Sequence, residues 1–287
     1  MNEPVPEPYD LTGLVDMHIH SAPDVQPRYA DDIEIVRQAR QAGLRAVLLK
    51  SHVTLTSDRA VIAEKAVGEI QVFGGLALND PVGGLNPAAV EAALRMGAKE
   101  IWMPTRSAAH MHRQEGKPGG ITLMADLAAP GEPSPLRPEV YEIIDLIAAA
   151  DAILATGHVS PAESVALANC ARQRGVRKIL VTHPEAAFIR MPAELQASLA
   201  RAGVFFERCY VDTTPFMDSA VKLAEIAEMI RRIGVGSTVL STDFGQAGNA
   251  SPVEGMRAYL AGLSAEGFRP QEIQRMAGEN PADLLGL

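Results

Sequence analysis

From residue 14 onward, the chain alternates short apolar runs with longer amphipathic segments. Runs of four to eight residues rich in Val, Ile and Leu are typical of buried strands, and apolar spacing near 3.6 residues indicates helices. The expected strands are Leu14–His20, Ala46–Val53, Gln71–Leu78, Glu100–Thr105, Ala152–His158, Lys178–His183, Val204–Tyr210 and Thr238–Phe244. The expected helices cover about 31–42, 58–67, 87–96, 138–149, 161–174, 192–202, 218–232 and 253–264. This alternation predicts a parallel sheet with crossover helices.

A glycine follows five of the expected helices and precedes the next strand. Glycine is the common residue just past a helix end, because it adopts left-handed backbone angles without strain. The five are Gly43, Gly97, Gly175, Gly203 and Gly234. Their recurrence indicates a repeated strand–helix unit. Eight units favour a closed (β/α)8 TIM barrel of the α/β class, in one domain. A doubly wound open sheet is the alternative, although no GxGxxG follows the first strand.

Two segments fall outside this repeat. Residues 1–12 are acidic and proline-rich, so we expect a disordered N-terminal tail before a barrel domain of residues 13–287. They have neither the positive charge nor the apolar stretch of a signal peptide. Residues 107–137 form a long connection rich in Gly and Pro after the fourth strand. Loops of this length often act as lids or binding loops, so we expect a lid-like insertion over the barrel mouth.

The composition limits the classes of partner. The 287 residues carry a formal net charge of -9, which argues against nucleic acid or an anionic membrane as the main partner. No apolar stretch is long enough to span a bilayer. The two cysteines form no paired motif and are expected to be reduced. We therefore expect a cytoplasmic protein that acts on a small molecule.

The strongest local signal is the sequence LVDMHIH, in which His18 and His20 lie two residues apart near a strand end. Side chains alternate along a strand, so both imidazoles share one face. In a barrel, the C-terminal ends of the strands open into the active site. Two neutral imidazoles suit zinc, iron or manganese, although an isolated HxH more often only makes hydrogen bonds to its neighbours.

The other histidines favour a metal site over simple hydrogen bonding. Five of the seven histidines lie at the C-terminal ends of expected strands, and the other two, His110 and His112, lie in the loop above the same face. Convergence on one rim is what a metal site requires. The candidate ligands are His18, His20, His52, His158, His183 and Asp243. We expect a divalent metal there, zinc first, with manganese or iron as alternatives.

This pattern resembles the amidohydrolase superfamily of metal-dependent barrels. The residues that match its motifs are Asp16, His18, His20, His158, His183 and Asp243, between residues 14 and 245. The resemblance implies that the first pair of histidines and Asp243 bind metal, and that Asp243 also handles a proton of the attacking water. It implies that His158 and His183 bind metal or polarise the substrate. The chain is also similar to an uncharacterised branch of this group, which supplies no substrate. A homo-oligomer is a further expectation from the resemblance alone.

The chain departs from the superfamily at the fourth strand. Two-metal members carry a bridging carboxylated lysine or a glutamate there, whereas Lys99 and Glu100 stand at the start of that strand in this chain. Lys50 precedes His52 by two residues and is a possible substitute. One metal ion is therefore favoured over two.

Several other polar residues are candidates for the same face. Arg28 and Arg106 follow expected strands and could each hold a substrate carboxylate or phosphate, or could simply be solvated. Lys50 is a third substrate-binding candidate. Glu207 and Arg208 are adjacent on a strand, so only one of them can face inward. If Glu207 faces inward, it is a possible ligand. Asp16 is expected to point inward and to orient a histidine.

Together these features predict a metal-dependent hydrolase that opens an amide, lactam or lactone. The metal would acidify water and polarise a carbonyl or phosphoryl oxygen. Asp243 would accept a proton, and His158 or His183 would stabilise the oxyanion. The alternatives are a single-metal, non-hydrolytic decarboxylase on the same barrel, a PHP-like phosphoesterase, and a barrel that binds a ligand without catalysis.

Overall fold

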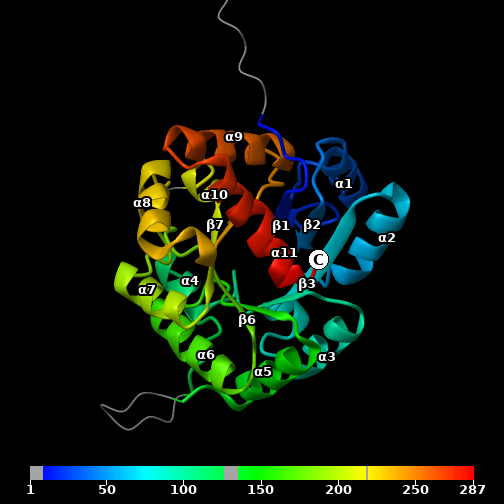
Figure 1. Ribbon diagram of the computed structural model, residues 1–287. Helices are drawn as coiled ribbons and strands as arrows, with labels where there is room; N and C mark the ends of the chain where they lie inside the picture. Colours follow the sequence, from blue (N-terminus) through cyan, green and yellow to red (C-terminus); the bar gives the residue numbers. More distant parts are fainter. Residues whose placement is uncertain (1–8, 126–134, 218) are drawn as a thin grey trace, which may run out of the picture.

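Eight parallel strands follow one another around the molecule in chain order. The structure is a computed structural model that describes residues 9–125, 135–217 and 219–287. Each strand pairs in parallel with the next, from β1 to β8 (Figure 1). The strands are β1 (Val15–His20), β2 (Ala46–Lys50), β3 (Gln71–Ala77), β4 (Glu100–Trp102), β5 (Ile153–Ala155), β6 (Lys178–Thr182), β7 (Phe205–Cys209) and β8 (Thr238–Ser241). All eight predicted strands are present, although most are shorter than the sequence pattern indicates.

The last strand returns to the first and closes the ring. The backbone N–H of His20 donates to the carbonyl oxygen of Phe244 at 2.8 Å, and the N–H of Asp243 donates to the carbonyl oxygen of His18, also at 2.8 Å. Ile19 and Phe244 form a parallel bridge. These contacts confirm the predicted (β/α)8 barrel.

Helices surround the strands, and short helical segments occupy some of the loops. They are α1 (Asp32–Gln41), α2 (Ser57–Val67), α3 (Pro87–Arg95), α4 (Ala109–Gln114), α5 (Pro138–Ala150), α6 (Pro161–Gln173), α7 (Ala193–Arg201), α8 (Leu223–Ile233), α9 (Pro252–Ala265), α10 (Pro270–Gln274) and α11 (Asn280–Leu285). None of the helices within the described ranges is long and apolar enough to cross a membrane.

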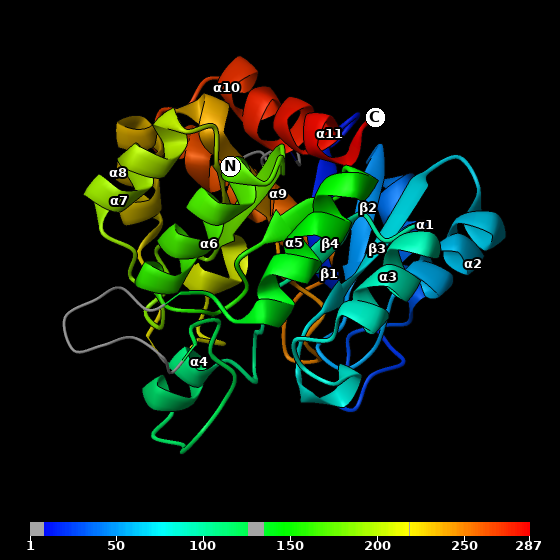
Figure 2. The ribbon, with the colours of Figure 1, turned by 90° about the horizontal axis from the view of Figure 1, so that it is seen from below.

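Apolar side chains fill the barrel and close one of its ends. One interior cluster consists of buried apolar side chains, among them Val15, Leu48, Trp102 and Leu180. Leu284 of α11 belongs to the same cluster. Figure 2 shows α11 at one end of the barrel and α4 at the other. The interior is therefore a packed core, and the cavity lined by Met111 of α4 lies at the other end.

A register shift in β1 corrects one expectation from the sequence. The pairing of β1 with β2 is irregular between Asp16 and Ile19. The carboxylate of Asp16 accepts hydrogen bonds from the backbone N–H groups of His18 and Thr242 and from the Thr242 hydroxyl. The prediction that Asp16 orients a histidine ring is therefore wrong, because this carboxylate joins the backbones of β1 and the segment after β8.

The two segments outside the repeat are described only in part. Residues 1–8 of the expected disordered tail lie outside the described residues, and Leu11 is already buried in the core. In the connection after β4, residues 126–134 lie outside the described residues. The rest of it contains α4 and is attached to α6, because the Glu163 carboxylate accepts from the Thr122 hydroxyl and the Leu123 N–H.

Candidate metal centre

The carboxylate of Asp243 is the centre of a cluster of imidazoles at the open end of the barrel. Its Oδ1 atom lies 3.0 Å from His20 Nε2 and 3.2 Å from His18 Nε2. Its Oδ2 atom lies 3.4 Å from His183 Nε2. Both Asp243 and His183 follow strand ends in left-handed backbone conformations, with φ of 52° and 53°. Such angles are uncommon for residues other than glycine and concentrate at functional sites.

Two further carboxylates fix the orientation of two of these rings. His18 Nδ1 lies 3.1 Å from Glu207 Oε2, and His183 Nδ1 lies 3.0 Å from Asp212 Oδ2. All four side chains are buried. Histidines that bind metals usually donate their other ring N–H to a carboxylate in this way. Both rings therefore present Nε2 toward Asp243.

The spacing of these atoms fits the ligand shell of a single divalent ion. Ligands about 2.1 Å from one metal lie roughly 3.0–3.4 Å from each other in octahedral or tetrahedral geometry. The three distances to Asp243 span that range, from 3.0 to 3.4 Å. Asp243 Oδ1 is buried and makes no hydrogen bond of acceptable geometry among the described residues. A buried carboxylate oxygen without a hydrogen bond, surrounded by imidazole nitrogens, is what a cation would satisfy.

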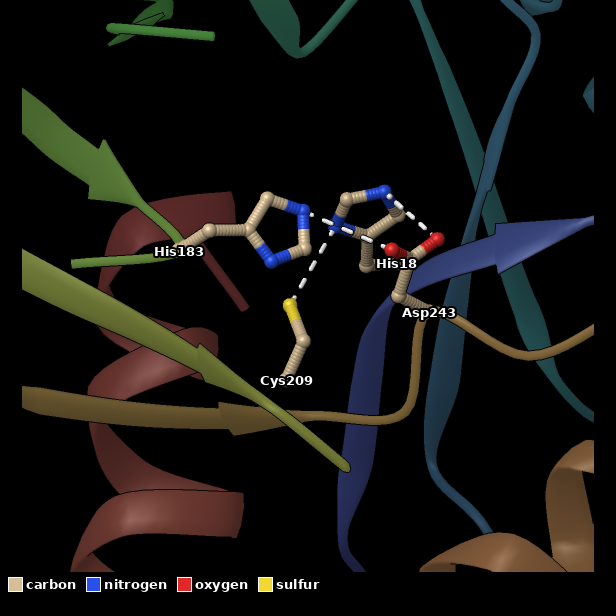
Figure 3. A group of neighbouring side chains, drawn as sticks. All are labelled: His18, His183, Cys209 and Asp243. Carbon is tan, nitrogen blue, oxygen red and sulfur yellow. Dashed lines mark hydrogen bonds and ion pairs between the residues drawn. The ribbon is translucent and has the colours of Figure 1, made fainter. Parts of the chain in front are cut away.

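Cys209 on β7 belongs to the same group of potential ligands (Figure 3). One ligand atom each from His18, His183, Cys209 and Asp243 lies within 4.8 Å of the others. The thiol is 3.7 Å from His18 Nδ1, on the side of the ring that faces Glu207. Burial raises the pKa of this thiol well above its usual range, and the charge of Glu207 adds to the effect. Cys209 therefore lies behind the His18 ring rather than beside Asp243.

His52 and His158, the other two predicted ligands, lie beside this cluster, and the His158 ring is 5.4 Å from the His183 ring. They line the same cavity, with ring centroids 6.1 Å apart. His52 stacks on His20 at 4.8 Å. Neither ring nitrogen of His158 has a hydrogen-bond partner among the described residues, so this side chain is free to bind a ligand in the cavity.

Burial keeps several of these imidazoles neutral. It lowers the pKa of His20 to about 3, despite the nearby carboxylate of Asp243. It also holds the pKa values of His52 and His158 well below the usual range, and neighbouring positive charges add to the effect. Burial lowers the pKa of His183 too, but the carboxylate of Asp212 outweighs it and the net pKa is raised. Burial raises the pKa of Asp243, but the surrounding imidazoles, led by His18, hold it well below its ordinary value.

Charged side chains continue into the barrel below His18. Lys50 Nζ lies 3.0 Å from His18 Nε2 and 4.9 Å from the centre of the Trp102 ring. Burial lowers the pKa of Lys50, against the opposing charges of Asp243, Glu207 and Glu100. Lys50 is fully buried and is not among the residues that line the cavity, so it does not reach the position predicted for a substrate-binding residue.

A cavity of about 280 Å³ opens above the cluster. His20, His183 and Asp243 form part of its floor, and Phe188 packs against His158 and His183 at ring distances of 5.0 and 5.6 Å. The remaining lining residues are Arg28, His52, Arg106, Met111, Glu115, His158, Val211, Asp212, Phe216, Met217 and Gln246. Ten of these fifteen residues are polar or charged, and the apolar surface comes from Met111, Phe188, Val211, Phe216 and Met217.

Both predicted substrate-binding arginines reach this cavity. Arg106 is exposed there and has no acceptor among the described residues. The Arg28 side chain is 5% exposed and pairs with Asp24 at 2.9 Å, while its Nε atom has no partner among the described residues. Two guanidinium groups with unused donors can bind an anion.

The sequence did not assign the roles of three residues that shape the centre, although Glu207 was named as a possible ligand if it faced inward. Glu207 faces inward but orients His18, because its other oxygen, Oε1, accepts from Ser241 Oγ at 2.9 Å. Asp212, the partner of His183, lies in a turn beyond β7. Cys209 lies close to the ligands, with its thiol 3.7 Å from His18 Nδ1. The only signal for these three was their position at the end of the seventh strand.

Solved structures confirm the fold that the resemblance predicted. An amidohydrolase from Pseudomonas aeruginosa aligns over 96% of this chain and 95% of its own, with 13% identity and a TM-score of 0.63. A proposed 2-pyrone-4,6-dicarboxylic acid hydrolase from Pseudomonas putida aligns over 97% and 98%, with 15% identity and a TM-score of 0.63. A lactonase from Listeria monocytogenes aligns over 96% and 95%, with 11% identity and a TM-score of 0.63. At these identities the likeness shows the fold alone.

Comparison of the sequence, rather than the structure, identifies a family. No curated protein matches it. The pattern that defines a family of unknown function (DUF6282) matches residues 13–207, which is more than half of the chain. The chain therefore belongs to the family of unknown function DUF6282.

Proposed function

We propose that this protein is a metal-dependent hydrolase that opens the amide, lactam or lactone bond of a small organic acid. The observation that carries the proposal is the convergence of His18, His20 and His183 on the carboxylate of Asp243, with the three Nε2 atoms 3.0–3.4 Å from its oxygens. These four residues would hold one divalent ion, zinc first, with manganese or iron as alternatives. When bound, the ion supplies Lewis acidity and makes water easier to deprotonate near neutral pH.

Asp243 would act as the general base. The neighbouring imidazoles, His18 foremost, hold its pKa well below the ordinary range, so it is a carboxylate at neutral pH. One oxygen can face the metal while the other accepts the proton of the attacking water and passes it to the leaving group. His183 Nε2 lies 3.4 Å from Asp243 Oδ2, a separation that fits two ligands of the same ion.

His158 would polarise the substrate carbonyl. Both of its ring nitrogens are buried without partners among the described residues, and the ring lines the cavity. A donor fixed at this point can stabilise the negative charge that develops on the carbonyl oxygen. Phe188 packs on the ring at 5.0 Å and restricts its rotation.

Two guanidinium groups in the cavity, near the carboxylates of Glu115, Asp212 and Asp243, are the basis for proposing an acidic substrate. Arg28 and Arg106 face it with unused donors, and guanidinium groups match the geometry of carboxylates. The printed names of two structures with this fold, a lactonase and a 2-pyrone-4,6-dicarboxylic acid hydrolase, support a lactone or a related ring as the bond that opens. A cytoplasmic location and a small molecule as the partner complete the proposal, in agreement with the net charge of -9.

A matched pair of lactones tests this function. Purified protein loaded with zinc, manganese or iron is assayed for proton release with γ-butyrolactone and with its 3-carboxylate. We expect ring opening, a preference for the carboxylate, loss of activity after chelation and recovery after the metal is restored. The same samples are assayed for carbon dioxide release and for hydrolysis of p-nitrophenyl phosphate. Turnover confined to either of these two assays would replace the proposal by a decarboxylase or a phosphoesterase.

A further inference from the structure

The side-chain amide of Asn79 holds three segments of the barrel rim together. Its Oδ1 atom accepts from the backbone N–H groups of Thr105 and Ser107, at 2.9 and 3.1 Å. Its Nδ2 atom donates to the carbonyl oxygen of His52 at 2.9 Å and to Thr105 Oγ1 at 2.7 Å. Backbone N–H groups can only donate, so these contacts determine which end of the amide is oxygen. Asn79 therefore uses both of its N–H groups as donors.

The Thr105 hydroxyl connects the Asn79 amide to the His52 ring. Thr105 is fully buried, and its Oγ1 atom accepts a hydrogen bond from Asn79. The same oxygen lies 2.8 Å from His52 Nδ1. Within the described ranges, that nitrogen is the only acceptor available to the hydroxyl hydrogen. A buried hydroxyl without an acceptor is costly, so Thr105 donates to Nδ1 and the ring proton of His52 is on Nε2.

The protonated nitrogen of His52 faces the cavity. The ring lines the cavity, is partly exposed, and stacks on His20 with an interplanar angle of 28°. Since Nδ1 is occupied by Thr105, Nε2 is the nitrogen left for a ligand. To bind a metal through Nε2, the ring would have to move its proton to Nδ1, and Thr105 would then lose its acceptor. The network therefore favours a donor at this position over a metal ligand.

Arg106 adds a positive charge beside this donor. It follows Thr105 directly in the chain, lines the same cavity, and has no acceptor among the described residues. A neutral N–H and a guanidinium group on one wall offer two donors to one anionic group. Carboxylates bind to such paired donors with short, directed hydrogen bonds.

We propose that His52 and Arg106 form a binding subsite for a substrate carboxylate, in which His52 is a fixed donor and not a metal ligand. Thr105 and Asn79 act through His52 as positioning residues. The carboxylate is taken to belong to the substrate of the proposed hydrolase, and in this respect the inference rests on that function. The position of the His52 proton and the metal content do not depend on the function.

The first experiment measures the tautomer of His52. Long-range ¹H–¹⁵N correlation spectra of protein labelled at histidine, loaded with zinc, show which ring nitrogen carries the proton, and His52→Phe assigns the signals. We expect Nε2–H in the wild type and in Thr105→Ser, which keeps the hydroxyl. In Thr105→Val, which removes it, the preference for Nε2–H should weaken. A wild-type ring protonated at Nδ1 overturns the proposal.

The second experiment separates anion binding from metal binding. Titration with benzoate, a simple carboxylate, should shift the His52 Nε2 signal, and the apparent Kd should rise on the order of tenfold in Arg106→Met. Zinc per chain in His52→Phe should equal that of the wild type. The control is His112→Phe, since among the described residues the half-buried His112 ring hydrogen-bonds only to the carbonyl oxygen of Pro118 and should change neither reading. Loss of zinc in His52→Phe would make His52 a ligand and contradict the inference, as would benzoate binding that does not depend on Arg106. Both readings hold even if no lactone is hydrolysed.

Discussion

His18 Nδ1 lies 3.1 Å from Glu207 Oε2, and both side chains are fully buried. Burial raises the pKa of Glu207, but the charges of His18 and Lys50 outweigh it, so the group is a carboxylate. It therefore accepts a hydrogen bond from the Nδ1–H group of His18. The Nε2 lone pair of His18 is then directed at the Asp243 cluster. The same relationship holds between Asp212, in the turn after β7, and His183, which directly follows β6.

Removing the charge of Glu207 should weaken metal binding without unfolding the protein. In Glu207→Gln the amide still fills the space and can still accept one hydrogen bond, but it no longer stabilises a positively polarised His18. Partners of this kind typically contribute 10- to 100-fold to metal affinity. We expect a loss of that size in competition titrations against a chelator. Asp212→Asn should have a similar effect, and equal affinity in both variants and the wild type would refute the role given to these carboxylates.

Asp243→Asn should separate metal binding from catalysis. The amide oxygen can still contact the metal, but it cannot take a proton. Loss of a general base typically costs about 10²–10⁴ in rate. We expect kcat to fall by this amount while Asp243→Asn keeps more metal than His18→Ala, which loses an imidazole. Metal per chain and kcat are measured side by side. Wild-type turnover in Asp243→Asn with its metal in place would transfer the role of base to His158 or His183.

Arg28→Met should reduce the preference for acidic substrates. The side chain is 5% exposed, and its Nε atom has no acceptor among the described residues. Methionine keeps much of the apolar stem but removes the charge. The ratio of kcat/KM between the 3-carboxylate of γ-butyrolactone and the plain lactone should fall on the order of tenfold, because a hydrogen bond to a charged group contributes about 1.5–3 kcal/mol. The exposed Arg37 gives the matched control, Arg37→Met, in which the ratio should not change.

Glu163 should make the stability of the protein sensitive to acid. Burial raises its pKa, but hydrogen bonds from Ser160, Thr122 and Leu123 outweigh it, so its pKa lies below the ordinary 4.5. A lowered pKa in the folded state means that the stabilisation is present above the unfolded pKa and is lost as the pH falls through the folded value. Glu163→Gln should lower the free energy of unfolding at pH 7 by about 1–3 kcal/mol.

Urea denaturation at pH 7 and pH 3.5 measures this contribution. The difference between wild type and Glu163→Gln should shrink at the lower pH, because Glu163 takes up a proton in the unfolded chain at a higher pH than in the folded protein. Glu69→Gln is the control, since the Glu69 side chain is 86% exposed. A difference that is the same at both pH values would show that the charge of Glu163 does not hold Thr122 and Leu123 of the long loop.

The alternation of strand and helix segments predicts the fold, and the alternation of side chains along each strand predicts the main ligands. His18 and His20 share a face at the mouth of the barrel, and Asp243 meets them, as the order of strands requires. The same rule fails for Asp16, because the register of β1 shifts beside it. A bulge depends on backbone pairing, which the pattern of apolar residues does not encode.

Alternation also leaves open which side of β7 faces inward. In the structure Glu207 faces the site, while Arg208 is buried on the other side against Glu185 at 3.1 Å. Asp212 could not be assigned at all, because it follows the strand in a short helical turn whose direction is set by tertiary contacts. Residues on strands were therefore predictable, and residues that orient them from turns were not.

Metal content tests the central claim most directly. Elemental analysis of protein purified from metal-supplemented cells, and again after chelation and reloading, gives the number and kind of ions per chain. We expect one divalent ion per chain in the wild type, a strong loss in His18→Ala, and no change in His112→Ala, whose ring hydrogen-bonds only to the Pro118 carbonyl oxygen within the described part of the chain. A wild-type protein that takes up no divalent metal, or a His18→Ala variant that retains as much as the wild type, would contradict the assignment of this cluster as a metal centre.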